Sequence, residues 1–223
     1  MKPSQISVVI PTLNEESVVA DAVRSAIEAG ATEVIVSDGG SRDQTIPNAT
    51  AAGASKIIRS LPGRGIQLNA GAVFASHEVV LFLHADCRLS EASLLQICES
   101  SEVVWGAFVQ QIEAKGLGYR LLEKGNAMRV KYRWLPFGDQ AIFVRRATYK
   151  EQGGFEEISL MEDLAFSKWM RKIAKPVLLP GPVSMSPRHW EKRGIVRQTA
   201  FNLWLQLSYA CGVSPDRLAK RYR

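Results

Sequence analysis

The stretch "EVVLFLHADCRLS" (residues 78–90) decides the fold, because it joins an apolar run to a polar end. "EVVLFL" is short and rich in aliphatic residues, which is typical of a strand covered on both faces. His84, Asp86 and Arg88 then follow at every second position. This pattern fits either a sheet edge that turns into solvent or the lip of a site for a metal and a phosphate.

Three similar strands come before it. They are "ISVVI" (6–10), "TEVIVSDGG" (32–40) and "SKIIRS" (55–60), and a single helical segment lies between each pair of strands. Capping-box spacings at Thr12–Glu15 and Ser41–Gln44 predict the starts of two of these helices. Strands that alternate with single helices predict an α/β fold with a mainly parallel central sheet and helices on both faces.

The pattern changes after Ser101 but contains no linker and no repeat. We expect strands at 103–112 and 139–146, helices at 117–134, 159–173 and 194–212, and an extended segment broken by prolines at 176–186. The sequence therefore predicts a single domain.

Composition is that of an ordinary globular chain, with 223 residues, 46% hydrophobic and 22% charged. No apolar run approaches the roughly 18–20 residues that span a bilayer, and "MKPSQISVVIP" does not resemble a signal peptide. We therefore expect a cytoplasmic protein. Its three cysteines form no C-x-x-C pair, which favours reduced thiols.

Charge is distributed unevenly along the chain. Residues 1–114 carry a net charge of −6, and residues 115–223 carry +12. One interpretation is an uneven solvated surface. The other is contact between the second half and something anionic, such as a lipid head group, a phosphorylated acceptor or a membrane surface. No nucleic-acid-binding motif accompanies the basic residues, so nucleic acid is not an expected partner.

Polar residues follow the four predicted strands, and the carboxyl ends of parallel strands meet at one edge of a sheet. Glu15, Asp38, Arg64 and Asp86 would lie along that edge. An arginine at a helix start suits a diphosphate, and a carboxylate suits a hard cation bound to that diphosphate. Such a set favours a ligand that combines a base or ribose, a diphosphate and a metal ion.

Several motifs together resemble family 2 glycosyltransferases of the GT-A fold. They are "VVIPTLNEE", "SDGGSRDQT", "GRGIQLNAGA", "LFLHADCRL", "GGF" and "MEDLAFSKWMRK". "FLHAD", "FGDQAIFVRR" and "SLMEDLAFS" are also similar to a short bacterial subgroup associated with radical-SAM and selenium-related proteins. The resemblance implies a Rossmann-like sheet and a metal-dependent, inverting enzyme that uses nucleotide-diphosphate sugars.

The resemblance also implies roles for individual residues. Those expected to bind the nucleotide sugar are Pro11, Leu13, Glu15, Asp38, Arg64, Asn69, His84, Asp86 and Gln140. The D-x-D motif of the family occurs here as His84-Ala85-Asp86. Asp86 would therefore hold Mg²⁺ or Mn²⁺, while His84 would contact the ribose or act as a second metal ligand. His189 is a further candidate metal ligand, because relatives often return a late histidine to the metal.

The family places its catalytic base at the second acid of the pair in "LMEDLAF", which is Asp163. Glu162 beside it would raise the pKa of that base or bind the acceptor. The alternative is that both acids only favour the start of a helix. By the same resemblance, residues 1–114 form the half that binds the nucleotide sugar, and residues 115–223 form the half that binds the acceptor and carries the base.

Partners beyond the donor stay open. The acceptor is unidentified, and an anionic or lipid-linked molecule is one version. The apolar helix at 195–211 would pack in the core or in a homodimer, or lie on a membrane as a peripheral contact. His84 in place of a carboxylate motivates a non-catalytic sensor of sugar nucleotides, and the chemistry at phosphate leaves a nucleotidyltransferase as a further alternative.

Overall fold

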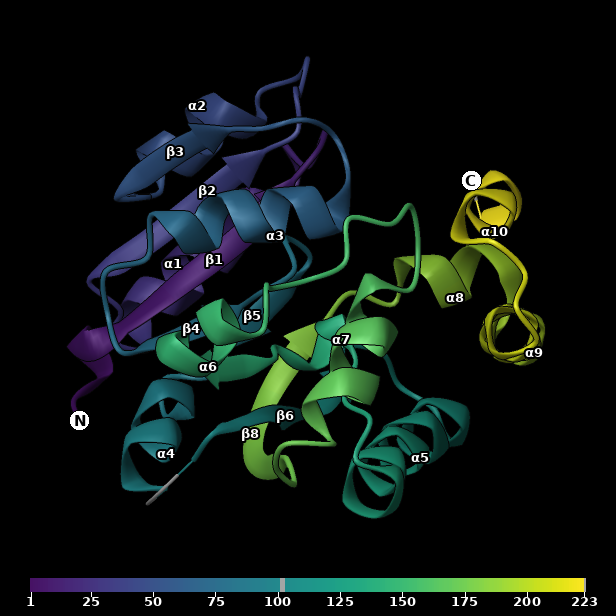
Figure 1. Cartoon of the computed structure of the whole chain (residues 1–223). Coiled ribbons are helices and arrows are strands. Elements are labelled where there is room, and N and C mark those ends of the chain that lie inside the picture. The colour runs from purple at the N-terminus through teal and green to yellow at the C-terminus, as the bar shows by residue number, and fades with distance from the viewer. Residues whose placement is uncertain (101–102, 223) are drawn as a thin grey trace.

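The computed structural model describes residues 1–100 and 103–222, apart from the side chains of His189 and Lys192. In these ranges eight strands form one sheet, in the order β3-β2-β1-β4-β7-β6-β8-β5 (Figure 1). Their bounds are β1 Ile6–Thr12, β2 Glu33–Asp38, β3 Lys56–Arg59, β4 Val79–Phe82, β5 Cys87–Leu89, β6 Trp105–Ile112, β7 Phe143–Arg145 and β8 Val177–Met185. Residues from both halves of the sequence therefore share one sheet, as expected for a single domain.

The sheet is mixed but mostly parallel. β1 pairs in parallel with β2 and β4, β2 with β3, and β6 with β8. β7 is antiparallel to both β4 and β6, and β5 is antiparallel to β8. In the parallel part, Thr12 pairs with Asp38 and Val9 with Phe82, so these strands end at the same edge. This confirms the predicted fold class.

Helices cover both faces of the sheet. They are α1 Val19–Glu28, α2 Thr45–Ala51, α3 Arg64–Val73, α4 Ser93–Glu99, α5 Leu117–Arg133, α6 Arg146–Glu151, α7 Glu162–Met170, α8 Arg188–Arg193, α9 Ile195–Ala210 and α10 Pro215–Tyr222, with short 3₁₀ turns η1 Pro3–Gln5 and η2 Gly138–Gln140. Alternate residues of each strand face opposite sides. Val8 and Ile10 of β1 pack in one apolar cluster with α1, and Val9 packs in a second cluster with α3, α6 and α7.

Both predicted capping boxes are wrong. Thr12 ends β1, and its hydroxyl donates to Asp38 Oδ1 at 3.1 Å, while the Ser41 hydroxyl donates to the same oxygen at 2.5 Å. α1 and α2 begin later, at Val19 and Thr45, without a side-chain cap. The hydroxyls that cap a helix in the local pattern instead fasten the ends of β1 and β2 to the loop after β2.

The expectation that the late apolar helix packs in the core is also wrong. Along α9 only Gln198 and Leu205 are buried, whereas Leu203 and Leu207 are more than half exposed. Homodimer contact and membrane contact through this helix stay predictions. None of the described helices combines the length and apolar character needed to cross a bilayer.

Candidate active site

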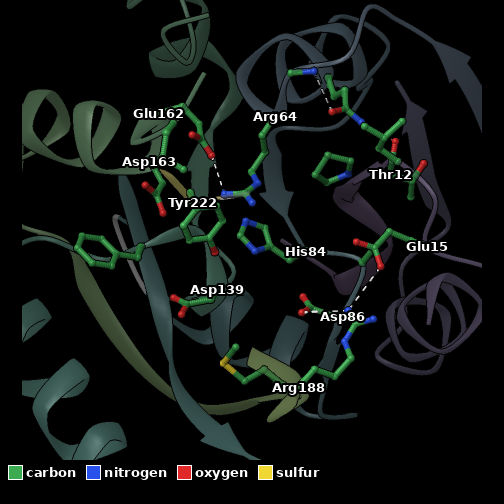
Figure 2. A pocket seen from close by; sticks show the side chains of 18 of the residues that line it. Thr12, Glu15, Arg64, His84, Asp86, Asp139, Glu162, Asp163, Arg188 and Tyr222 are labelled. Atoms are coloured by element: carbon green, nitrogen blue, oxygen red, sulfur yellow. Dashed lines mark hydrogen bonds and ion pairs between the residues drawn. The ribbon is translucent and has the colours of Figure 1, made fainter. Parts of the chain in front are cut away.

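A cavity of about 510 Å³ opens where β1 and β4 end and α3, η2 and α7 begin (Figure 2). Its lining comes from segments far apart in the sequence: Pro11, Thr12, Leu13 and Glu15; Pro62, Gly63, Arg64 and Gln67; His84, Ala85 and Asp86; Phe137 and Asp139; Ser159, Leu160, Glu162 and Asp163; and Met185, Arg188, Trp190, Gln198, Asn202 and Tyr222. The sheet topology thus brings together Glu15, Arg64 and Asp86, three of the four residues that the sequence placed at strand ends.

His84 lies in the cavity wall and packs closely on Gly138. A Cβ on Gly138 would lie 2.4 Å from His84 Nε2, so only glycine fits there. Burial, helped by the positive charge of Arg64, lowers the pKa of His84 to about 4. The imidazole is therefore neutral near pH 7 and offers one donor and one acceptor nitrogen.

Asp86 and Glu15 face each other across one positive charge. Arg188 Nη2 lies 3.4 Å from Asp86 Oδ2 and 3.5 Å from Glu15 Oε2. Burial raises the pKa of Glu15, and Arg188 opposes that rise. Two carboxylates arranged around a cation are a donor set that suits Mg²⁺ or Mn²⁺, which prefer oxygen ligands.

Ligand atoms of His84, Asp86 and Cys87 also lie within 4.8 Å of one another. Cys87 is fully buried, and burial raises the pKa of its thiol well above the ordinary value. A protonated sulfur is a poor ligand for hard cations. Within this group, Asp86 and His84 therefore fit Mg²⁺ or Mn²⁺ better than Cys87 does. Glu15, across Arg188 from Asp86, is a further oxygen ligand nearby.

Arg64 stands at the first position of α3, where Gly63 adopts φ +143° before it. Its Nη1 lies 2.9 Å from Oε1 of Glu162, a carboxylate that is 1% exposed. The Glu162 charge raises the pKa of Arg64, so the guanidinium stays positive at the cavity wall. Gly65 allows the start of α3 to pack closely on the backbone of Glu156, because a Cβ on Gly65 would lie 2.3 Å from Glu156 O.

Asp163 lies on the first turn of α7 and points into the cavity (Figure 2). Its Oδ2 accepts a hydrogen bond of 2.9 Å from the Gly138 backbone N–H. Met161, just before the helix, has φ +72°, a left-handed conformation that costs a non-glycine residue about 1 kcal/mol. This strained turn directs the adjacent acids of α7 toward the cavity.

The structure places three of the predicted site residues outside the cavity lining. Asp38 is 1% exposed, and its carboxylate accepts hydrogen bonds from Thr12, Gly40 and Ser41. Asn69 bonds Tyr149 and Phe155. Gln140 is fully buried, and its Oε1 accepts from Arg129 at 2.8 Å. Their predicted contacts with the nucleotide sugar stay predictions; in the structure these side chains hold neighbouring loops and helices.

Other predictions and omissions concern the C-terminal segments. His189 was predicted as a metal ligand, but its side chain lies outside the described part of the chain. Tyr222 of α10 projects between Arg64 and Asp139 in the cavity (Figure 2). No local motif in the sequence predicts this position. Trp190 also lines the cavity and was not predicted. Both residues reach the site only through the packing of α8–α10.

Comparisons with known proteins identify one matching family. A family model described as glycosyl transferase family 2 matches residues 7–154. Uncharacterised glycosyltransferases of Mycobacterium bovis and Mycobacterium tuberculosis are 34% identical over 94 residues, which cover 42% of this chain and 42% of each relative. The match thus spans less than half the length of these curated relatives.

Solved structures share the fold at low identity. TarS 1-349 of S. aureus has a TM-score of 0.64 at 19% identity, over 87% of this chain and 65% of that one. Glucosyl-3-phosphoglycerate synthase of Mycobacterium tuberculosis, in complex with Mn²⁺, uridine diphosphate and glucosyl-3-phosphoglycerate, has a TM-score of 0.57 at 19% identity, over 94% of this chain and 80% of that one.

Proposed function

The chain belongs to glycosyl transferase family 2, and from that premise we propose that it transfers a sugar from a nucleotide-diphosphate donor to an acceptor oxygen with inversion. One observation carries the proposal: Asp86, Arg64 and Asp163 line one cavity. Membership of the radical-SAM and selenium-associated subgroup stays a prediction of the sequence.

Donor binding is assigned to the half of the chain before residue 115. Pro11, Leu13 and Glu15 at the end of β1 would contact the base and ribose. Arg64, positive and at a helix N-terminus, would contact the diphosphate. Support comes from solved neighbours with this fold, since TarS has been crystallised with UDP-GlcNAc.

Mg²⁺ or Mn²⁺ would be held by Asp86, with Glu15, His84 or His189 beside it. When bound, the cation neutralises charge on the leaving diphosphate. Arg188 already places a positive charge between Asp86 and Glu15, and it would turn from these carboxylates to a phosphate oxygen once the donor enters. The metal complexes of glucosyl-3-phosphoglycerate synthase support this assignment.

The second half of the chain supplies the base. The acceptor hydroxyl oxygen forms the bond to the anomeric carbon, and the bond from that carbon to the diphosphate breaks with its electrons on the diphosphate. The hydroxyl proton passes to Asp163, whose Oδ2 is already oriented by the Gly138 N–H at 2.9 Å. Glu162 is occupied by Arg64 and is assigned a positioning role.

Calorimetric titration tests this function. Uridine and guanosine diphosphates, with and without Mn²⁺, are titrated into the wild type and Asp86→Asn. We expect one diphosphate to bind in a metal-dependent way and to lose most of its affinity in the variant. Binding of both nucleotides without metal and unaffected by the substitution would contradict the proposal. Donor binding without any sugar transfer or hydrolysis would favour the sensor.

A further inference from the structure

A second cavity of about 580 Å³ adjoins the first and is lined by residues of α5 and α9. These two helices lie away from β1–β3 (Figure 1). We call this cavity the α5–α9 groove. The residues it shares with the first cavity are Arg64, Phe137, Asp139, Leu160, Asp163, Trp190, Asn202 and Tyr222. Because Asp163 belongs to both, a molecule in the groove would reach the proposed base from the side opposite the donor loops.

The walls of the groove are partly apolar, although α5 and α9 also contribute polar and charged side chains: Asn126, Arg129, Arg133, Thr199, Asn202 and Gln206. The apolar side chains contributed by the two helices are Leu122, Met128, Tyr132, Leu203 and Leu205. Met128 and Leu203 are 50% and 54% exposed, which is costly for side chains of this size unless something covers them. Gly125 also lines the groove, and a Cβ there would meet no atom within 4 Å, so α5 leaves open space at this point.

The inner end of the groove carries the positive charge of Arg129, which interacts with the nearby charges of Asp139 and Asp163 but makes no direct salt bridge with them. Arg129 donates to Leu135 O, Asn126 Oδ1 and Gln140 Oε1, all of which are neutral acceptors. In the described part of the chain it makes no salt bridge, whereas Arg64 and Arg188 in the first cavity do. A guanidinium has five N–H donors, so Arg129 keeps donors for an anion.

Polar atoms of three residues that line the groove also lack partners. Among the described residues, Asp139 Oδ1, Trp190 Nε1 and Thr199 Oγ1 are buried without a hydrogen bond, and all three residues line the groove. Trp190 itself is only 7% exposed. Buried polar atoms normally have partners, so these atoms favour a polar ligand in the groove.

We infer that the α5–α9 groove binds the acceptor, and that the acceptor is an amphiphile with a phosphate-bearing, hydroxylated head and a hydrocarbon chain. This rests on the proposed function, which supplies the donor and the base. The head lies between Arg129 and Asp163, and the chain lies between Met128 and Leu203. The net charge of +12 in residues 115–223 favours the same anionic class.

The test measures binding of dodecyl phosphate, below its micelle concentration, to the whole chain by calorimetry. Butyl phosphate lacks most of the hydrocarbon chain, and dodecyl maltoside lacks the charge. Because each buried CH₂ gives about a fourfold gain in affinity, we expect dodecyl phosphate to bind at least about a hundredfold more tightly than butyl phosphate. Equal affinities would overturn the hydrocarbon part, and equal binding of the maltoside would overturn the anionic part.

Two variants locate the binding. Gly125→Phe fills the groove and should weaken dodecyl phosphate at least about tenfold. Leu121→Phe adds a ring on the same helix outside the groove lining and should leave the affinity within about twofold. Equal effects of the two substitutions would overturn the location. Arg129→Met should remove the preference for phosphate over maltoside, and a melting curve for each variant shows that it is folded.

Donor binding separates the two proposals. The same protein is titrated with the nucleotide diphosphates and Mn²⁺. If a nucleotide binds and dodecyl phosphate does not, the acceptor inference fails and the proposed function stands. If dodecyl phosphate binds in the groove and no nucleotide binds, the glycosyl-transfer assignment fails and the groove remains an amphiphile site.

Discussion

Arg188 reaches back 102 positions along the chain to place Nη2 3.4 Å from Asp86 Oδ2. The same nitrogen lies 3.5 Å from Glu15 Oε2, so one cation separates two carboxylates. Carboxylates that face each other repel unless a positive charge lies between them. Arg188 thus holds the place in which the proposed metal would lie, and it links α8 to the donor cavity.

Arg188→Gln separates two proposed roles of Arg188, which are competition with the metal for Asp86 and Glu15 and binding of a phosphate of the nucleotide. We expect the variant to bind Mn²⁺ alone several-fold more tightly, because the metal no longer competes with a guanidinium. Nucleotide diphosphate should bind several-fold more weakly, because one phosphate partner is lost. Paired titrations with metal and with nucleotide measure both effects. A fall in both affinities would contradict the competition.

Asp163→Asn removes the proposed base while keeping the size of the side chain. The rate of transfer should fall by about 10²–10⁴-fold, because a positioned base contributes that much, while donor affinity changes little. Turnover and donor binding are measured on the same preparations, with Asp21→Asn as a surface control. A variant that keeps its full turnover number would rule out Asp163 as the base.

The Arg64–Glu162 pair predicts unequal costs for its two partners. Glu162 is 1% exposed, whereas the Arg64 side chain is 41% exposed. Arg64→Ala leaves a buried charge and should lower the free energy of unfolding by about 2–3 kcal/mol. Glu162→Gln leaves an arginine that water can reach and should cost about 1 kcal/mol. Denaturant unfolding measures both, and the reverse order would contradict this account of the pair.

Gly138 and His84 should be energetically coupled. A Cβ on Gly138 would overlap His84 Nε2 at 2.4 Å, so Gly138→Ala should destabilise the fold by about 1–3 kcal/mol. His84→Ala removes the clash, so the double variant should lose less than the sum of the single ones. A double-mutant cycle in urea measures the coupling, and strictly additive losses would show that the contact is relieved elsewhere.

Acid should weaken the fold through Glu33. Burial raises the pKa of Glu33, but hydrogen bonds from Ser7, Ser76 and Lys56 outweigh this and lower the pKa to about 2. Because the folded value lies below the unfolded one, the stabilisation is complete above about pH 4.5 and is lost as pH falls toward 2. Glu33→Gln should remove about 1–2 kcal/mol at pH 7 and much less near pH 2. Unfolding curves across this range measure the difference, and a loss that does not vary with pH would contradict it.

Much of the fold was predictable because strand and helix patterns are local. The positions of β1–β4 and α3, and the meeting of Asp86 with Arg64, follow from alternation and from the rule for strand ends. Pairings across the sheet are not local: Thr12 and Ser41 read as helix caps, yet their hydroxyls bond Asp38. The strand β7 was predicted within 139–146, but its antiparallel position between β4 and β6 has no local signal.

The candidate site was predictable only where a motif marked it. Asp163 and Asp86 belong to such motifs and line the cavity. Tyr222 and Trp190 arrive through the tertiary packing of α8–α10, which no periodicity encodes. Conversely, the apolar pattern of α9 indicated a buried helix, but Leu203 and Leu207 are more than half exposed, and Leu203 lines the α5–α9 groove.

The central claim is that Asp86, Arg64 and Asp163 surround one nucleotide sugar and its cation. A crystal grown with Mn²⁺ and the preferred nucleotide diphosphate tests it, because the anomalous scattering of manganese locates the metal in an anomalous difference map. The account predicts a peak about 2.1–2.3 Å from an Asp86 oxygen, with the diphosphate beside Arg64 and the open side of the cavity toward Asp163. Manganese bound away from Asp86, with the nucleotide outside this cavity, would contradict it.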